Sequence, residues 1–461
     1  MGMSANHAEI PSSLASGWVE VESPDFRREE IQLSIGDSPI LPSLPLTLGG
    51  FFAERHYRRG QAASAISGRR GFPLSRYTVA IMSTIGALLR RAAFPEESMA
   101  VTVEAVQAAL KDLIDPNTRK DYVSSKALRN LKVEGGAVSF DIELGYPAKS
   151  QVEPIRAAVE AAVKALPGVE RVVANVYCKI VAHAVQRGVK LMPGVKNIIA
   201  VASGKGGVGK STTAANLALA LSQEGASVGI LDADIYGPSQ PQMLGIPDGQ
   251  PVSVDGQSME PLLAHGLQVM SVGFLVDVET PMVWRGPMVV QALDQLLNQT
   301  HWENLDYLIV DLPPGTGDTQ LSLSQKVPVT GAVIVTTPQD IALIDARKGL
   351  KMFEKVGIPI LGIVENMSIH ICSSCGHEEH IFGSGGGEKM CADYGMELLG
   401  SLPLELAIRE MADSGKPTVV GAPESRAAEI YRAIARRIAV KVAEKAKDMS
   451  SRFPNIVVEN T

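Results

Sequence analysis

A glycine-rich segment ending in Lys-Ser has the residue types needed to hold phosphate groups. Residues 204–211 read Gly-Lys-Gly-Gly-Val-Gly-Lys-Ser and fit the spacing Gly-x4-Gly-Lys-Ser. Glycines let backbone N–H groups face an anion, which a side chain would block. Lys210 would neutralise β- and γ-phosphate oxygens, and Ser211 would offer its hydroxyl to Mg²⁺. We therefore predict an ATP site comprising Gly204, Lys205, Gly206, Gly207, Val208, Gly209, Lys210, Ser211 and Thr212.

Lys205 is an additional cation at the open rim of this segment. A cation at that position can reach the phosphates bound by a neighbouring subunit, as an arginine finger does. Lys205 therefore predicts an ATP-linked homodimer, and the alternative is an ordinary solvated surface lysine.

Carboxylates follow two further apolar runs. Asp232 and Asp234 come after residues 227–231, and Asp311 ends the run 306–310. Parallel strands present their carboxyl ends at one edge of a sheet, where ligands bind. Asp311 is therefore predicted to hold Mg²⁺ through water, Asp234 to orient the attacking water, and Asp232 to be a second carboxylate on the magnesium side. The alternative for a single such aspartate is a helix cap.

Two cysteines lie three positions apart, Cys372 and Cys375, with His370 before them and His377 and His380 after. Two thiolates supply half of the ligands of a tetrahedral zinc site or a four-iron cluster, so two chains would complete either one. Zinc bound within one chain with His377 or His380 is the alternative. A redox dithiol has less support, because no thioredoxin-like pattern surrounds the pair.

The elements that position these residues alternate between strands and helices. Strands are predicted at 197–202, 227–231, 307–310, 332–336 and 359–364, with a helix over 212–223 and an amphipathic helix along 427–442. Such alternation is typical of an α/β fold with a mostly parallel, doubly wound sheet. We assign residues 197–448 to this P-loop NTPase domain and residues 449–461 to a tail.

A smaller α+β domain is predicted over residues 99–182, before a linker at 183–196. Apolar residues at helical spacing around 106–113 end at Asp115-Pro116, and residues 138–144 alternate as a strand. A helix at 152–166 and a β-branched run at 169–180 follow. The predicted order is therefore helix, strand, helix, strand.

Residues 1–98 differ in composition from the rest of the chain. They contain ten Arg and no Lys, whereas residues 99–461 contain thirteen Arg and twenty Lys. We expect Met99 to be the natural start and residues 1–98 to be a disordered or non-native extension. The alternative is a targeting segment, suggested by Arg69-Arg70 before the apolar stretch 78–89. Ten acidic residues, and Arg90-Arg91 in place of a small-residue cleavage site, argue against it.

Composition excludes several classes of protein. The chain of 461 residues has 43 basic and 50 acidic side chains and a net charge of −7, which disfavours nucleic acid as a partner. No apolar run reaches the roughly 18 residues that a membrane span needs, so we expect no membrane partner and a cytoplasmic location. Four cysteines exclude a disulfide scaffold, and Cys178 and Cys391 are expected to be buried and inert.

Several motifs together resemble a known family. Residues 204–211 resemble the deviant phosphate loop of the MinD/ParA ATPases. Segments 232–239 (Asp-Ala-Asp-Ile-Tyr-Gly-Pro-Ser), 284–288 (Trp-Arg-Gly-Pro-Met), 311–318 (Asp-Leu-Pro-Pro-Gly-Thr-Gly-Asp) and 365–375 look like the Mrp/ApbC iron–sulfur carriers. The resemblance covers about residues 102–445 and excludes 1–98.

This resemblance implies a homodimeric ATP hydrolase that carries a [4Fe-4S] cluster bridged by Cys372 and Cys375 of both chains. ATP binding or hydrolysis would be linked to transfer of the cluster from donors to apo iron–sulfur proteins. Asn366 and the loop at Pro403 would hold the adenine, and a carboxamide is suited to that because it offers both a donor and an acceptor to a base.

Two other functions remain open from the sequence. A MinD/ParA-like positioning ATPase with a structural zinc site would share the phosphate loop and the dimer but would not need the cysteine pair. An electron-transfer ATPase of the nitrogenase iron-protein kind also bridges a cluster across a dimer. Its cysteine ligands, however, are usually far apart in sequence.

Overall fold

The computed structural model describes residues 101–183, 192–253, 255–275, 286–317, 320–321, 327–372 and 374–450. The predicted extension at 1–98 lies outside the described residues, as do residues 451–461 of the predicted tail. Trp284, Arg285 and Asp318, which belong to the family-like motifs, also lie outside them.

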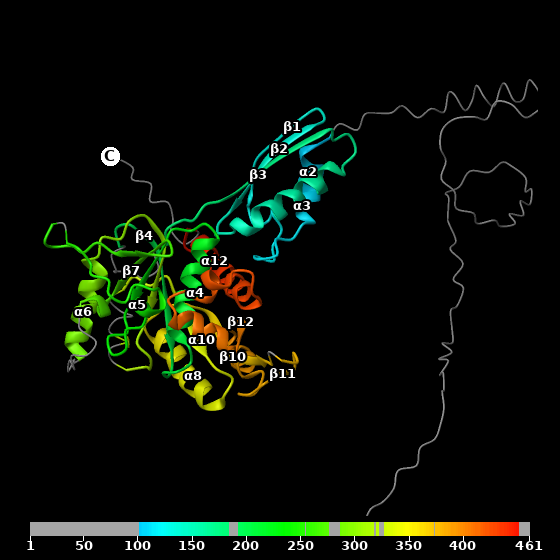
Figure 1. The fold of residues 1–461 in the computed structure, drawn as a ribbon. Coiled ribbons are helices and arrows are strands. Elements are labelled where there is room, and N and C mark those ends of the chain that lie inside the picture. The colour runs from blue at the N-terminus through cyan, green and yellow to red at the C-terminus, as the bar shows by residue number, and fades with distance from the viewer. Residues whose placement is uncertain are drawn as a thin grey trace, which may run out of the picture. The chain divides into compact units, whose positions relative to one another are not determined.

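A small three-stranded sheet with two helices forms the first described part. Strand β2 pairs antiparallel with β1 and parallel with β3, as Figure 1 shows. The elements are α2 (Val103–Lys111), β1 (Leu128–Glu134), β2 (Ala137–Leu144), the short 3₁₀ helix η1 (Lys149–Gln151), α3 (Val152–Lys164) and β3 (Arg171–Cys178). The predicted order of helix, strand, helix, strand was wrong in missing β1. That strand alternates exposed and half-buried residues and has no apolar run to signal it.

Alternation along β2 creates the core of this part. Every second residue of the strand, from Val138 to Leu144, is buried. The helices contribute buried residues at three- and four-residue spacing, namely Val106 and Leu110 of α2 and Ile155, Val159 and Val163 of α3. Each fully buried aliphatic side chain stabilises the fold by roughly 1.5–3 kcal/mol, so the buried face of the sheet and the two helix faces contribute to the stability of this part.

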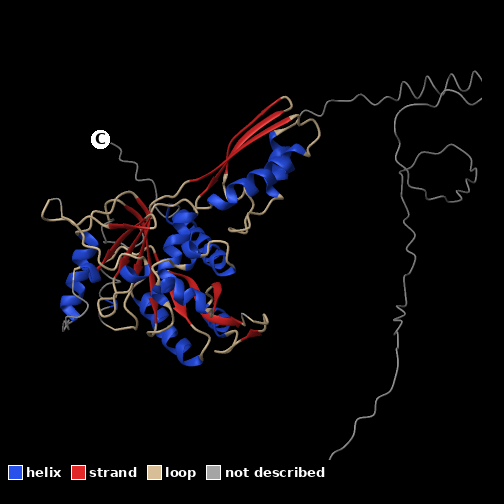
Figure 2. Ribbon diagram, in the orientation of Figure 1, coloured by secondary structure: helices blue, strands red, loops and turns tan. Residues whose placement is uncertain are grey.

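A larger, mostly parallel sheet forms the second part (Figure 2). Its strand order is β11-β10-β9-β4-β8-β5-β7-β6, and β12 pairs with β10. The β6–β7 and β10–β11 pairs are antiparallel and the other pairs are parallel. The strands are β4 (Val195–Ser203), β5 (Val228–Asp232), β6 (Leu262–Ala264), β7 (Leu267–Ser271), β8 (Leu305–Asp311), β9 (Gly331–Thr336), β10 (Ile360–Ile371), β11 (Glu378–Glu379) and β12 (Leu398–Pro403).

Two pairs of helices pack on this sheet: α4 with α12, and α8 with α9. The helices are α4 (Lys210–Gln223), α5 (Gln240–Met243), η2 (Val272–Phe274), α6 (Gly286–Asn298), α8 (Asp340–Lys355), α9 (Gly386–Tyr394), α10 (Leu406–Asp413), α11 (Thr418–Gly421) and α12 (Arg426–Ser450). The predicted α/β class with a mostly parallel, doubly wound sheet and a preceding small α+β part is confirmed.

Continuous apolar runs explain why the inner strands were predictable. All residues of β5 and β9 are buried, and β4 and β8 each have one residue that is not. Strands β6, β7, β11 and β12 were missed, because they are short or lie toward the edges of the sheet. Since β4, β5 and β8 are parallel, the residues that follow each of them meet at one edge of the sheet.

The last helix, α12, carries the predicted apolar stripe on its buried face. Ala427, Tyr431, Ile434, Ile438 and Val442 are buried where the helix packs on α4 and β12. The predicted amphipathic helix is therefore confirmed, and its apolar face packs on the larger part. Within the described ranges, no helix is long and apolar enough to cross a membrane.

Candidate functional site

The phosphate loop connects the end of β4 to the start of α4. Gly207 and Gly209 adopt φ of 82° and 79°, a left-handed conformation that favours glycine. A Cβ on Gly204 would lie 2.1 Å from the backbone carbon of Asp345, so glycine is also needed for the close approach of α8. By contrast, a Cβ on Gly206 would meet no atom within 4 Å. The glycines thus allow the backbone of the turn, and Gly206 lies where no other atom of the described residues is packed against it.

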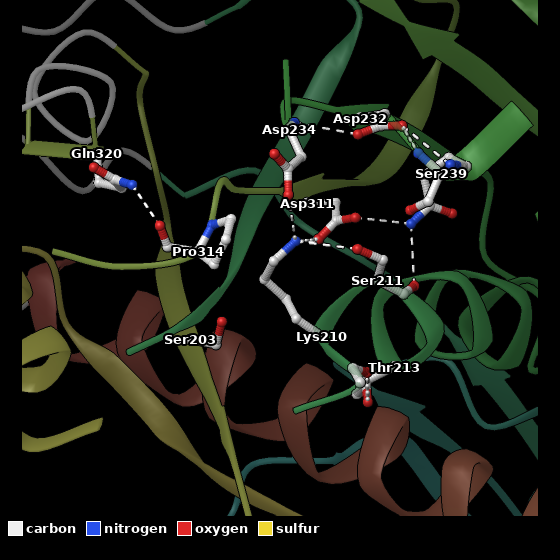
Figure 3. Close-up of polar contacts among 12 residues, drawn as sticks. Ser203, Lys210, Ser211, Thr213, Asp232, Asp234, Ser239, Asp311, Pro314 and Gln320 are labelled. Atoms are coloured by element: carbon white, nitrogen blue, oxygen red, sulfur yellow. Dashed lines mark hydrogen bonds and ion pairs between the residues drawn. The ribbon is translucent and has the colours of Figure 1, made fainter. Parts of the chain in front are cut away.

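Lys210, the first residue of α4, lies at the centre of a buried polar cluster (Figure 3). Its ammonium group donates to Oδ1 of Asp311 and to the hydroxyl of Ser211, the latter at 3.1 Å. Oδ2 of Asp234 lies 3.8 Å from the same nitrogen. Lys210 is 6% exposed and Asp311 is fully buried. These carboxylates therefore compensate the charge of a buried cation at the phosphate loop.

Asp232 is fully buried, and its oxygens are held by the segment that follows β5. One of its oxygens, Oδ2, accepts hydrogen bonds from the backbone of Ser239 and Gln240 and from the hydroxyl of Ser271, at 2.9–3.1 Å. Burial, followed by the neighbouring charge of Asp311, raises the pKa of Asp232 to about 7. Asp232 thus anchors the segment after β5, and its predicted place on the magnesium side stays a prediction.

Asp234 does face the open part of the site. Burial raises the pKa of its carboxyl group, and the charge of Lys210 opposes that shift. The carboxylate borders a cavity of about 230 Å³ beside the phosphate loop. The cavity is lined by Ser203, Lys205, Gly206, Gly207, Gly209, Lys210, Ser211, Thr212, Asp234, Ser239, Met243 and Pro314. Most of the predicted ATP-site residues therefore surround one cavity.

Some predicted residues support the loop without lining this cavity. Asp311 lies behind Lys210, and Gly204 lies against α8. The side-chain amide of Asn366 donates to the backbone carbonyl of Val208 at 2.9 Å. Pro403 ends β12 and pairs with Ile369 of β10. The adenine-binding role predicted for Asn366 and Pro403 stays a prediction.

Strand β10 links the phosphate loop to the cysteine turn. Asn366, midway along the strand, holds the loop, and Cys372 follows the last residue of the strand. Glu365, next to Asn366, is 2% exposed and accepts hydrogen bonds from the hydroxyl of Ser368 and the backbone of Gly387. At Met367 the backbone has φ of 56°, and pairing with β12 shifts register there. A short irregular stretch of one strand therefore joins the two predicted sites.

The cysteine turn lies at the surface. Cys375 is exposed and Cys372 is half-buried. The turn is closed by hydrogen bonds from Cys372 N–H to the His377 carbonyl and from Gly376 N–H to the Cys372 carbonyl, at 2.9 and 2.8 Å. Hydrogen bonds from the backbone of Ser374 and Cys375, and then from the Cys375 thiol, lower the pKa of Cys372. The turn thus favours the thiolate that binds metals.

The neighbouring histidines are engaged with the backbone. Nδ1 of His370 lies 2.9 Å from the Leu404 carbonyl, and Nδ1 of His380 lies 2.9 Å from the Ser368 carbonyl. The described residues contain no group of three or more His, Cys, Asp or Glu side chains that could hold a metal ion. Burial raises the pKa of Cys178 and of Cys391, to about 11 for Cys391, so both are poor nucleophiles.

Sequence reasoning missed three residues of this region. Gln240 contacts Asp311 and Ser211, Ser239 lines the cavity, and Glu365 holds the start of α9. Ser239 ends the family-like segment 232–239, which could have indicated it. Glu365 begins the family-like segment 365–375, which could likewise have indicated it. Gln240 carries no signal beyond its nearness to segment 232–239, because a buried amide cannot be told from a surface one by sequence alone.

Known proteins resemble the chain over both described parts. A family model described as NUBPL iron-transfer P-loop NTPase matches residues 194–439, and one described as iron-sulfur cluster assembly protein matches residues 103–176. An iron-sulfur cluster carrier protein of Escherichia coli is 50% identical over 351 residues, covering 75% of this chain and 95% of that one.

Two further comparisons extend this likeness. An iron-sulfur cluster carrier protein of Pseudomonas fragi is 61% identical over 278 residues, covering 60% of this chain and 97% of that one. A solved nucleotide-binding protein of Archaeoglobus fulgidus in complex with ADP is 37% identical. It covers 50% of this chain and 90% of its own, with a TM-score of 0.45.

Proposed function

This chain belongs to the family of iron–sulfur cluster carrier P-loop NTPases, and we propose that it binds and hydrolyses ATP to control the transfer of a [4Fe-4S] cluster. The cluster is the cargo, held between two copies of the chain and passed from a donor to apo iron–sulfur proteins. The observation that carries this proposal is strand β10, which contacts the phosphate loop through Asn366 and leads directly into Cys372.

The phosphate-loop cavity supports binding of the nucleotide phosphates. Glycine backbone groups and Lys205 border it, and the ammonium group of Lys210 faces it. Lys210 now pairs with Asp311 and Asp234. Phosphate oxygens would replace these carboxylates as its partners, because a nucleotide brings more negative charge to the same nitrogen.

The residues around Lys210 also fit Mg²⁺. Asp311 and Ser211 offer oxygen ligands, which this ion prefers. The buried Oγ of Ser239 and Oε1 of Gln240 have no hydrogen-bond partner among the described residues, so they could accept hydrogen bonds from ion-bound water. When bound, Mg²⁺ would neutralise charge on the phosphates.

Asp234 is the residue we propose to orient the attacking water. Its carboxylate lines the cavity, and its backbone N–H donates to Asp232 at 3.2 Å, which fixes its segment. Gly315 N–H donates to the Ser203 carbonyl at 2.9 Å, so the segment after β8 also contacts the loop. That contact would let the segment respond to the γ-phosphate.

The cysteine turn supports cluster binding by two chains. Cys372 and Cys375 supply two thiolates, and a [4Fe-4S] cluster takes four. A symmetric homodimer would supply the other two, and Lys205 at the cavity rim would reach the partner's phosphates. We propose a reducing, cytoplasmic setting, because both thiols must stay reduced to bind iron.

The proposal is tested by cluster transfer under anaerobic conditions. The cluster-loaded protein is mixed with an apo [4Fe-4S] dehydratase, with and without Mg·ATP, and recovery of dehydratase activity is followed. We expect transfer in both cases, at rates that differ with nucleotide. Equal rates would contradict ATP coupling, and no recovery would contradict the carrier function.

A further inference from the structure

Gln240 contacts three parts of the phosphate site, although no motif includes it. It begins α5 and is fully buried. Its side-chain nitrogen donates to the backbone carbonyl of Ser211 at 3.0 Å and to Oδ2 of Asp311 at 2.9 Å. Figure 3 shows Ser211 and Asp311 beside Lys210. Both partner atoms are oxygens that accept hydrogen bonds here, so the nitrogen end of the Gln240 amide must face them.

The backbone of Gln240 contacts a second buried carboxylate, that of Asp232. Its N–H donates to Oδ2 of Asp232 at 3.0 Å. Asp232 and Asp311 are paired residues of the neighbouring parallel strands β5 and β8, and both are fully buried. Two such carboxylates repel each other. Gln240 donates a hydrogen bond to each of them and so stabilises the pair.

The two oxygens of Asp311 have different partners. Lys210 donates to Oδ1, and Gln240 donates to Oδ2. If phosphate oxygens replace Asp311 as the partner of Lys210, Oδ1 of Asp311 loses its hydrogen bond, whereas Oδ2 keeps the hydrogen bond from Gln240. The carboxylate would then keep its orientation and present one free oxygen toward the magnesium position.

We propose that Gln240 is a positioning residue that holds Asp311 in the orientation required for Mg²⁺ and ties the segment carrying Asp234 to the phosphate loop. This inference rests on the proposed nucleotide function. Asp234 lies between two fixed points, Asp232 at the end of β5 and Gln240 at the start of α5. Loosening Gln240 therefore disturbs the magnesium side of the site and leaves the glycine loop intact.

The test compares three variants for ADP binding by calorimetry, once with Mg²⁺ and once with EDTA. Gln240→Met keeps the side-chain volume and removes the amide, and Gln240→Glu places a carboxylate against Asp311. Gln242→Met is the matched control, because Gln242 belongs to the same short helix and donates to the exposed carbonyl of Asp413.

We expect Mg²⁺ to tighten ADP binding about 10-fold less in Gln240→Met than in the wild type, since a hydrogen bond to a charged group is lost. In Gln240→Glu, Mg²⁺ should tighten ADP binding even less. In Gln242→Met, Mg²⁺ should tighten ADP binding as much as in the wild type. In EDTA all four proteins should bind ADP alike. Thermal unfolding without nucleotide checks that each variant folds. A variant that fails is replaced by Gln240→Asn, which is too short to reach both acceptors and should show the same loss.

Two results would overturn the inference. Gln240→Met could keep the full magnesium effect, which would remove any positioning role. It could instead weaken ADP binding equally with Mg²⁺ and with EDTA, which would make Gln240 a general structural residue. Failure of the wild type to bind ADP would instead count against the proposed nucleotide function, so the two failures are distinguishable.

Discussion

The phosphate site lies at the edge of the parallel sheet and contains buried charged side chains, whereas the cysteine turn lies at the surface after the last residue of β10. Around Lys210, a single chain supplies the cation, the carboxylates and the glycine backbone, with Lys210 and Asp311 buried. At the turn, a single chain supplies two thiols, one exposed and one half-buried. The first site is assembled within one chain, whereas the second, in the proposed function, would supply only half of the thiolates of a cluster.

This difference bears on how each site can work. A buried cation needs compensating charge, which Asp311 and Asp234 supply to Lys210. An exposed pair of thiols remains accessible to a partner chain, a donor or an acceptor. Retention of the nucleotide should therefore depend on one chain, and retention of the cluster on assembly.

Removing the Lys210 ammonium group should have the largest effect. We expect Lys210→Ala to reduce the rate of ATP hydrolysis by at least about 100-fold, because the main positive charge facing the phosphates is lost. The variant should still take up iron, measured after reconstitution. Lys351→Ala is the control, since Lys351 is an exposed residue of α8 that pairs with Glu354. A rate of ATP hydrolysis in Lys210→Ala equal to that of the wild type would contradict the role of Lys210 at the phosphates.

Removing one thiol tests the role of the cysteine turn in binding iron. Cys372→Ser should lose bound iron after reconstitution, because a hydroxyl is a poor replacement for a thiolate ligand. Its ADP affinity should stay within about 2-fold of the wild type, since no new buried charge is created. Cys178→Ser should retain iron and serves as the control. Brown colour and iron retained in Cys372→Ser would count against this ligand.

The contact between the two regions can be weakened separately. Asn366→Ala removes the hydrogen bond to the Val208 carbonyl. We expect ADP binding to weaken by about 5- to 10-fold, the value of one hydrogen bond, without loss of iron. Asn298→Ala, at an exposed hydrogen bond on α6, is the control. Loss of iron together with nucleotide would indicate that the two regions form one site.

The last prediction concerns the pH dependence of stability, to which Asp232 should contribute. Its pKa is raised to about 7 by burial, above the ordinary value of 3.8. Between these values the folded state holds a proton that the unfolded state has lost, so stability falls as pH rises. In nucleotide-free protein, the unfolding free energy should fall by at most about 1.4 kcal/mol per pH unit from this group.

Urea titrations at pH 4 to 7 measure this slope. Asp232→Asn cannot ionise, so its stability should fall less steeply over the same range. Parallel slopes for the two proteins would show that Asp232 keeps an ordinary pKa. The buried cluster around Lys210 would then be less desolvated than the structure indicates.

Sequence reasoning succeeded where residue type and spacing determine geometry. Glycine spacing before Lys210 and the apolar runs of β4, β5, β8 and β9 were sufficient to predict the loop and the sheet edge. It failed for β1, which has no apolar run, and for Gln240, whose partner Asp311 lies 71 positions away in the sequence. No local pattern indicates which amide the fold will bury against Asp311.

The central claim is that two chains share one cluster through their Cys372 and Cys375 thiolates. It is tested most directly by anaerobic reconstitution with iron and sulfide, followed by iron, acid-labile sulfide and zinc analysis and by the mass of the particle in solution. The account predicts about four iron and four sulfide per two chains, in a particle of twice the chain mass. One zinc per chain, without sulfide, would contradict it.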